Sequence, residues 1–221
     1  MGDVRARGAG GRRGQPQGVA PTGGPEAPHP LAEKRVLLHT CCAPCSTWTV
    51  HYLRGLGAQV TGYWYNPNIH PYGEHELRRE ALAGYAAQVE LDVIWEPGYE
   101  MPAFLRAVVG REEQGARCAI CYRMRLERAA QAAAQRGLDA FTTTLLISPY
   151  QDLHTIEGIG QELAAAYGVM FYYENLRRGF AEHHRLAREH GLYRQRYCGC
   201  LYSEWEARDR AAATRRPPRG A

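Results

Sequence analysis

Seven cysteines carry the chemistry that this sequence indicates most strongly. A Cys-x-x-Cys pair allows two thiolates from one turn to bind the same metal centre, and such pairs recur at zinc and iron–sulfur sites. Repeated pairing within one short chain is not explained by thiols that only pack as small hydrophobic side chains. The spacing therefore predicts a metal or redox site. The cysteines fall into three groups: Cys41/Cys42/Cys45, Cys118/Cys121 and Cys198/Cys200.

The spacing leaves the identity of the metal open. A structural zinc site takes four protein ligands and an iron–sulfur cluster takes four thiolates, so either would leave three cysteines for a second metal or a redox dithiol. Adjacent side chains on an extended strand point to opposite sides. Cys41 and Cys42 can therefore bind one cluster only if the backbone has left the β conformation there, and otherwise they serve two metals.

The Cys198-Gly199-Cys200 sequence suits a strained, easily reduced disulfide better than a stable cross-link. Strained disulfides have higher reduction potentials and are labile. The glycine permits the backbone turn that such a short ring needs. The alternative is that both thiols are metal ligands.

Two polar stretches are candidates for substrate binding. The loop from Asn66 to Tyr72 carries amide, imidazole and aromatic groups suited to a polar ring-containing substrate, although a proline-rich turn would look similar. The 193–197 stretch interleaves tyrosines with arginines, which suits unstacked RNA bases and phosphates, although an amphipathic connector has the same composition. The candidate substrate-binding residues are Asn66, Asn68, His70, Tyr150, Arg194 and Arg196.

Short apolar runs alternate with helical patterns along the chain. This alternation predicts an α/β fold, with a mostly parallel sheet covered by helices on both faces. Pro44 suits the first turn of a helix, so the first cysteine group should lie where a strand leads into a helix. Ligands bind at the carboxyl ends of parallel strands, and we expect this group and the loops at Asn66 and Ser148 to converge there. We predict strands over 36–40, 59–65, 92–95, 140–147 and 169–173, and helices over 46–56, 74–89, 102–109, 117–136, 155–167 and 180–190.

The length of 221 residues allows one sizeable domain, which we place at 34–206. Residues 1–33 are rich in Gly, Pro and Arg and are predicted to be disordered, and 207–221 is predicted to be a frayed basic tail. The beginning of the chain has no apolar leader and no stretch reaches the length of a membrane span. With an odd number of cysteines, this predicts a cytoplasmic protein with no membrane partner. A net charge of +4 permits a nucleic-acid partner.

Taken together, the motifs resemble the QueH-type epoxyqueuosine reductases, the cobalamin-independent iron–sulfur family that completes queuosine synthesis in tRNA. The resemblance covers nearly all of 35–203. The matching stretches are Leu38-His-Thr-Cys-Cys-Ala-Pro-Cys-Ser46, Tyr65-Asn-Pro-Asn-Ile-His-Pro71, Arg117-Cys-Ala-Ile-Cys121, Thr142-Thr-Thr-Leu-Leu-Ile-Ser-Pro149 and Gly191-Leu-Tyr-Arg-Gln-Arg-Tyr-Cys-Gly-Cys200.

The resemblance implies a Rossmann-like fold of the adenine nucleotide α-hydrolase type. It also implies a 4Fe–4S cluster with an adjacent mononuclear iron. The implied reaction removes the epoxide oxygen of epoxyqueuosine at the wobble position of tRNA with a GUN anticodon, using two electrons from an external donor and two protons. By resemblance, Cys41, Cys42, Cys118 and Cys121 hold the cluster, Cys198 and Cys200 form a redox-active pair, and Cys45 has a catalytic role as a ligand of the second metal.

Two other classes of protein could carry similar cysteines. One is a tRNA sulfur-transfer enzyme of the ATP-pyrophosphatase type, which has a Ser-Gly-Gly-x-Asp-Ser phosphate loop after its first strand. This chain has Thr40-Cys-Cys-Ala-Pro-Cys-Ser46 at that place, which argues against ATP use. The other is a non-enzymatic, zinc-bound RNA-binding module, and the brown colour of an iron-containing protein would distinguish it.

Overall fold

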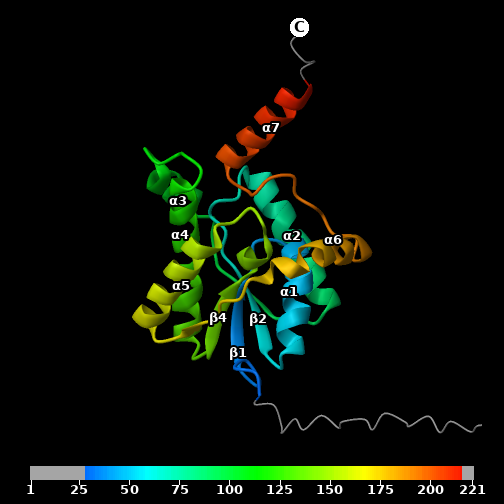
Figure 1. The fold of residues 1–221 in the computed structure, drawn as a ribbon, viewed down its shortest axis with the longest axis vertical. Coiled ribbons are helices and arrows are strands. Elements are labelled where there is room, and N and C mark those ends of the chain that lie inside the picture. Colours follow the sequence, from blue (N-terminus) through cyan, green and yellow to red (C-terminus); the bar gives the residue numbers. More distant parts are fainter. Residues whose placement is uncertain (1–27, 216–221) are drawn as a thin grey trace, which may run out of the picture.

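Five parallel strands form one sheet in the order β3-β2-β1-β4-β5 (Figure 1). The structure is a computed structural model, and it describes residues 28–215. The predicted α/β class with a parallel sheet is confirmed. The strands are β1 (Arg35–His39), β2 (Gln59–Trp64), β3 (Val93–Trp95), β4 (Ala140–Thr143) and β5 (Met170–Phe171).

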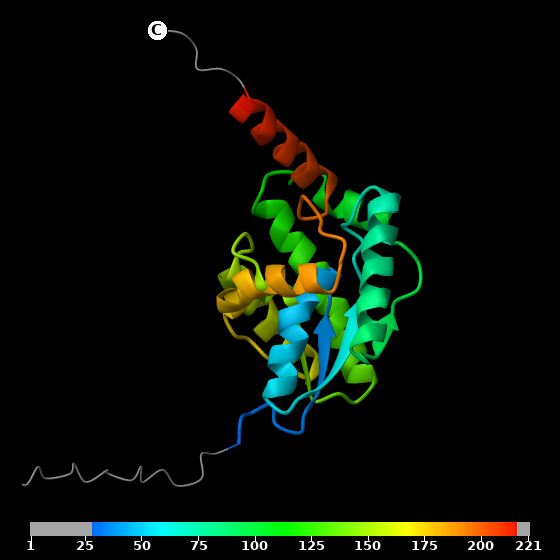
Figure 2. The same ribbon diagram turned by 90° about the vertical axis from the view of Figure 1, so that its right-hand side faces the viewer.

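Helices cover both faces of the sheet. The helices α1, α2 and α6 lie on one face, and α3, α4 and α5 lie on the other (Figures 1 and 2). None of the helices within 28–215 has the length and apolar character needed to cross a membrane. The helices are α1 (Ala43–Gly55), α2 (Tyr72–Gln88), α3 (Met101–Val108), α4 (Ala116–Gln135), α5 (Leu153–Tyr167), α6 (Phe180–Glu189) and α7 (Leu201–Arg215), with short 3-10 helices η1 (Thr144–Ile147) and η2 (Leu176–Gly179).

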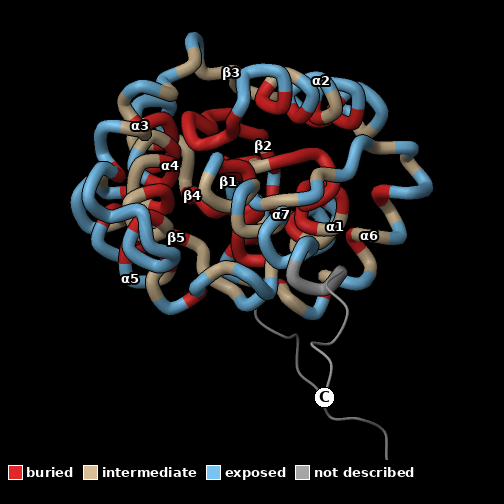
Figure 3. Tube along the Cα trace, turned by 90° about the horizontal axis from the view of Figure 1, so that it is seen from above, coloured by how far each residue is buried: buried red, intermediate tan, exposed pale blue. Residues whose placement is uncertain are grey.

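The central strand β1 shows how the sequence builds the two layers. Successive side chains on a strand point to opposite faces. Leu37 packs in the cluster that includes residues of α4, whereas Val36 and Leu38 pack in the cluster that includes residues of α1. All three are fully buried, so β1 reads as a continuous apolar run, as expected for a strand covered on both faces. Burial is greatest around this central strand (Figure 3).

Three sequence predictions about elements need correction. The predicted strand over 140–147 ends at Thr143, whose hydroxyl accepts a hydrogen bond from the Leu145 backbone N–H at 3.1 Å and starts η1. The spacing of Leu77, Ala81, Leu82 and Tyr85 predicts one apolar face for this helix, but Leu77 is 48% exposed and Arg78 is buried instead. The predicted frayed tail from residue 207 is helical as far as Arg215, in α7.

The beginning of the fold also differs from its prediction. Leu31 has no exposed surface and packs against Val36 and Leu53, so ordered structure starts before Lys34. The rest of the predicted disordered tail, residues 1–27, lies outside the described residues, as does 216–221.

Candidate metal and redox site

The first cysteine group lies at the turn between β1 and α1, at the carboxyl edge of the sheet. The Sγ atoms of Cys41, Cys42 and Cys45 all lie within 4.8 Å of one another. The strand has already ended at His39, so Cys41 and Cys42 are free of the alternation that would separate their side chains. Cys42 is extended immediately before the helix, and Cys45 lies in the first turn of α1, where the predicted Pro44 is also found. The three sulfurs thus form one candidate ligand set.

These three thiols share hydrogen bonds in a way that favours one thiolate. The pKa of Cys41 is held well below its usual range, chiefly because of hydrogen bonds with the Cys42 and Cys45 thiols. The Thr144 hydroxyl also donates to Cys41 Sγ, at 3.2 Å. The hydrogen bond with Cys41 raises the pKa of Cys42 to about 12. Metal binding would displace the remaining thiol protons, since thiolates are the ligands.

The second pair, Cys118 and Cys121, lies in the first two turns of α4, as predicted. Cys121 is buried in an apolar cluster with Phe104 and Cys200, and burial raises its pKa to about 12. Among residues 28–215, the tight group of sulfurs contains the three cysteines of the first turn and neither cysteine of α4. The two groups of cysteines therefore occupy two neighbouring places, and Cys118 packs against the core cluster that contains Cys42 and Cys45.

Arg125 lies between these two places and carries an uncompensated charge. It is 2% exposed, and its Nε donates to the carbonyl of Cys121 at 3.2 Å. Its Nη2 has no hydrogen-bond partner among the described residues. Burial disfavours its charge, but nearby Cys121, Cys198 and Cys41 outweigh this effect and raise its pKa.

A buried guanidinium is costly unless an anion compensates it. No ion pair joins Arg125 to a carboxylate within 28–215. A metal centre with several thiolate ligands is anionic and would supply the missing charge. The residues present therefore fit a thiolate-bound metal or iron–sulfur centre at this place.

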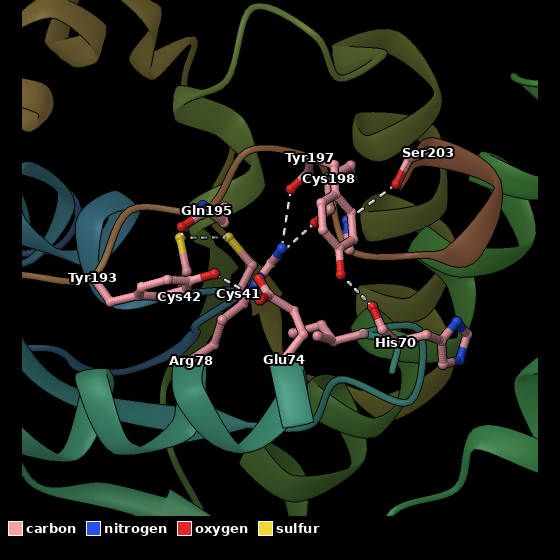
Figure 4. A network of polar contacts seen from close by, with 12 residues as sticks. Cys41, Cys42, His70, Glu74, Arg78, Tyr193, Gln195, Tyr197, Cys198 and Ser203 are labelled. Atoms are coloured by element: carbon pink, nitrogen blue, oxygen red, sulfur yellow. Dashed lines mark hydrogen bonds and ion pairs between the residues drawn. The ribbon is translucent and has the colours of Figure 1, made fainter. Parts of the chain in front are cut away.

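A segment that we call the strap, residues 193–200, lies over the first cysteine group (Figure 4). Gln195 Nε2 lies 2.9 Å from Cys42 Sγ. Arg78, which is buried in α2, donates to the carbonyls of Cys198 at 2.8 Å and Tyr197 at 3.0 Å. The same guanidinium pairs with Glu74 at 2.7 Å. These bonds fix the backbone just before the Cys-Gly-Cys pair.

The strap is also bonded to the loop that follows β2. The His70 backbone N–H donates to the Gly199 carbonyl at 2.8 Å, and the Tyr197 hydroxyl donates to the His70 carbonyl at 2.5 Å. Gly199 has a φ of 148°, and a Cβ there would lie 3.2 Å from Asn68 Nδ2, so the glycine is needed for this close approach. Gln151, from the loop that begins at Ser148, reaches Cys198 Sγ at 3.8 Å. The predicted convergence of the three loops is confirmed.

The candidate substrate-binding residues separate by exposure. Asn66, Asn68 and His70 are buried. Asn66 Nδ2 donates to the Thr40 carbonyl at 2.9 Å, and His70 Nε2 lies 3.1 Å from the Pro67 carbonyl. Tyr150 is 78% exposed, and Arg194 and Arg196 are exposed on the strap.

Four residues that contact this site were missed from the sequence: Arg125, Arg78, Gln195 and Thr144. Of these four, only Arg78 could have been found from the sequence. It follows Glu74 by four residues on one helix, and side chains at this spacing can form an ion pair.

The fold and the site together define a class of protein. A parallel Rossmann-like sheet carries clustered thiols, a buried cation and an exposed cysteine at its carboxyl edge, so this is an α/β protein whose clustered thiols could hold a metal ion.

The family follows from the comparisons. Residues 36–206 match the family model described as epoxyqueuosine reductase QueH, and this chain belongs to that family. The epoxyqueuosine reductase QueH of Dehalococcoides mccartyi is 40% identical over 172 residues, which cover 78% of this chain and 93% of that protein. The protein of the same name from Thermotoga maritima is 40% identical over 184 residues, covering 80% of this chain and 94% of the relative. That of Histophilus somni is 36% identical over 184 residues, covering 80% and 74%.

Proposed function

We propose that this protein is an epoxyqueuosine reductase that acts on tRNA in the cytoplasm. The observation that carries the proposal is the group of three sulfurs within 4.8 Å at the carboxyl edge of the sheet, beside a buried arginine that lacks a countercharge. Membership of the QueH family supports the reaction. The reaction adds two electrons and two protons to the epoxide. The epoxide oxygen leaves as water, and its two carbon atoms become an alkene.

The proposed cofactor is a 4Fe–4S cluster held by Cys41, Cys42, Cys118 and Cys121, with an adjacent mononuclear iron at Cys45. Such a cluster, when bound, passes electrons one at a time. Cys41, Cys42 and Cys45 are already grouped in this structure, and Cys118 packs against the core cluster that contains Cys42 and Cys45. The compact first group, which includes Cys45, is the place where assembly would begin.

The proposed redox pair is Cys198 and Cys200. Oxidation of two thiols to a disulfide releases two electrons and two protons, which balances the removal of one epoxide oxygen as water. Cys198 is exposed and can meet a bound base, whereas Cys200 is buried beside Cys121. An external electron donor would then reduce the disulfide again.

Substrate RNA would approach from the side of the strap. Arg194 and Arg196 are exposed there, and Tyr150 is exposed on the neighbouring loop. Guanidinium groups bind phosphates and tyrosine rings stack on unpaired bases. We therefore propose the anticodon loop of tRNA with a GUN anticodon as the substrate.

The proposal is tested with anaerobically reconstituted protein, by assaying iron and sulfide and by following epoxyqueuosine in digests of tRNA. We expect a 4Fe–4S absorbance and conversion of epoxyqueuosine to queuosine in the wild type. Cys118→Ser/Cys121→Ser protein should lose iron and sulfide. Cys198→Ser and Cys200→Ser proteins should keep the cluster and lose at least 100-fold in turnover, in line with the loss of an essential catalytic group.

The outcomes separate the roles of the cysteines. Loss of iron in both strap variants would make Cys198 and Cys200 ligands rather than redox groups. A colourless protein that binds zinc and RNA but does not change the nucleoside would favour the zinc-bound RNA-binding module and refute the reductase.

A further inference from the structure

A pocket of about 300 Å³ lies next to the redox site, between the beginning of α2 and the ends of β2 and β3. We call it the aromatic pocket, because five of its ten lining residues carry aromatic rings. These side chains are Trp64, Tyr72, His75, Trp95 and Tyr99. Its volume is at the lower end of the range for small-molecule sites, so it suits a single flat ring system.

The rings pack directly against one another, so they form a continuous aromatic wall on which a flat ligand can stack. The centroid of His75 lies 5.3 Å from Trp64 and 4.6 Å from Tyr99. Trp64 and Trp95 are 6.2 Å apart, and Tyr72 and Tyr99 are 5.5 Å apart. Tyr72 is 59% exposed, so part of the wall is open to solvent.

One polar atom in the wall lacks the partner that its burial requires. Trp64 is 2% exposed, and its indole Nε1 has no hydrogen-bond partner among residues 28–215. An indole N–H is only a donor, and a buried donor without a partner costs free energy. Because this atom has almost no exposed surface, a ligand in the pocket would reach it only after the wall rearranges.

The charged groups of the pocket already have partners. Glu76 pairs with Arg79 at 3.4 Å, and Glu96 pairs with Arg128 at 3.0 Å. Arg79 also lies over the Trp95 ring at 5.4 Å and occupies a position that a ligand cation would take. A neutral aromatic ligand therefore fits better than a cation.

The pocket and the strap are joined through Ile69 and His70. The Tyr99 hydroxyl donates to the Ile69 carbonyl at 2.5 Å, and the His70 ring lies 6.4 Å from the Tyr99 ring. On the other side, Tyr197 and Gly199 of the strap bond to His70. A nucleic acid bound at Cys198 would thus pass close to the aromatic pocket.

We propose that the aromatic pocket binds one unpaired nucleobase of the substrate RNA, a neighbour of the base that is reduced. The base stacks on the exposed part of the aromatic wall, where Tyr72 lies. This inference rests on the proposed function only in taking RNA as the substrate. It assigns a second contact that holds the loop while the modified base meets the cysteines.

Binding of an unmodified anticodon stem–loop RNA tests this inference without any epoxide chemistry. Two of the four tryptophans line the pocket, so stacking should quench the intrinsic fluorescence. We expect Trp95→Ala and Tyr72→Ala to weaken RNA binding at least fivefold, the lower value for loss of one stacked base. Tyr72→Ala removes an exposed ring, so this variant should fold even if Trp95→Ala does not.

Tyr167→Ala is the matched control, because Tyr167 ends α5 outside the aromatic pocket and its variant should bind RNA as the wild type does. Wild-type RNA affinity in Tyr72→Ala protein would overturn the inference. So would a fluorescence response to choline that is lost in the pocket variants while RNA binding is unchanged, since that would assign the pocket to a cation. Failure of the reductase reaction with pocket-dependent RNA binding intact would refute the proposed function alone.

Discussion

Arg125 is the residue that most directly links this fold to an anionic centre. Its neighbours are sulfur atoms rather than carboxylates, and its Nη2 is left without a partner among the described residues. Natural proteins rarely keep such a buried cation unless something compensates it. Negative charge on the cysteines around Arg125 would compensate its buried guanidinium.

Replacing Arg125 by Met tests this role. We expect the apo protein to be at least as stable as the wild type in thermal unfolding, because a buried unpaired charge is removed. Iron and sulfide per chain after anaerobic reconstitution should fall to less than about half, since the countercharge is lost. The matched control is Arg123→Met on the same helix, where Arg123 is half-exposed and pairs with Glu162. Full iron and sulfide content in Arg125→Met protein would contradict the role.

For single residues, the sequence predicted the cysteines of the site but not the residues that contact them. Thiol spacing is visible in a linear pattern, and it grouped Cys41, Cys42 and Cys45, whose sulfurs lie together and could hold a metal ion. Arg125 could not be found in this way, because an arginine every few residues of a helix usually faces solvent. Its burial depends on where the helix lies against the sheet, which only the assembled fold decides.

The strap is the element that carries the exposed cysteine, and it has no regular secondary structure of its own. Arg78 holds it through two carbonyls while pairing with Glu74. Arg is suited to this because its planar fork presents several donors at once, whereas Lys has a single ammonium. The position of Cys198 therefore depends on a helix that lies far from it in sequence.

Arg78→Lys should loosen the strap without breaking the ion pair with Glu74. We expect amide hydrogen exchange over 193–200 to become roughly tenfold faster, which corresponds to the loss of about 1.4 kcal/mol of local stability. The control is Arg54→Lys, because Arg54 also donates to two carbonyls, those of Val89 and Glu90, but not in the strap. Unchanged exchange over 193–200 in Arg78→Lys protein would show that other contacts hold this segment.

The errors in predicting the end of β4 and the helix α7 have local physical causes. The run from Ala140 to Ile147 is apolar and β-branched throughout, so nothing in its composition marks the point where β4 stops. The strand ends because the Thr143 hydroxyl accepts a hydrogen bond from the Leu145 backbone N–H, which starts η1. Helix α7 was missed because its pattern is mostly polar; it is held at its beginning by Arg117, which pairs with Glu206 at 2.7 Å and lies over Tyr202.

On the scale of the whole molecule, one edge of the sheet gathers the chemistry. The cysteine turn, the loop after β2, the loop after η1 and the strap all meet there, and α7 extends away from the body of the domain (Figures 1 and 2). A parallel sheet produces this gathering from topology alone, since the carboxyl ends of its strands lie along one edge. The same rule made the convergence predictable from sequence, whereas the aromatic pocket required the side-chain packing of α2 against β3.

The distribution of paired arginines indicates where RNA binds. Arg123 and Arg185 are exposed but paired with glutamates, at 2.6 Å in each case. By contrast, Arg194 and Arg196 form no ion pair within the described part of the chain and remain available for phosphates. Unpaired cations bind RNA more strongly because no intramolecular bond has to break first.

The Arg194→Ala/Arg196→Ala protein should therefore bind the anticodon stem–loop more weakly and with less dependence on salt. Each contact with a phosphate of single-stranded RNA contributes about 0.7 to the slope of log affinity against log salt concentration, so two lost contacts should reduce the slope by about 1.4. The matched control is Arg123→Ala/Arg185→Ala, which removes the same charge from paired positions and should leave the slope unchanged. Equal slopes in the strap variant and the wild type would exclude phosphate contacts by this pair. An unchanged iron–sulfur absorbance in both variants would show that the difference arises at the RNA surface and not at the metal site.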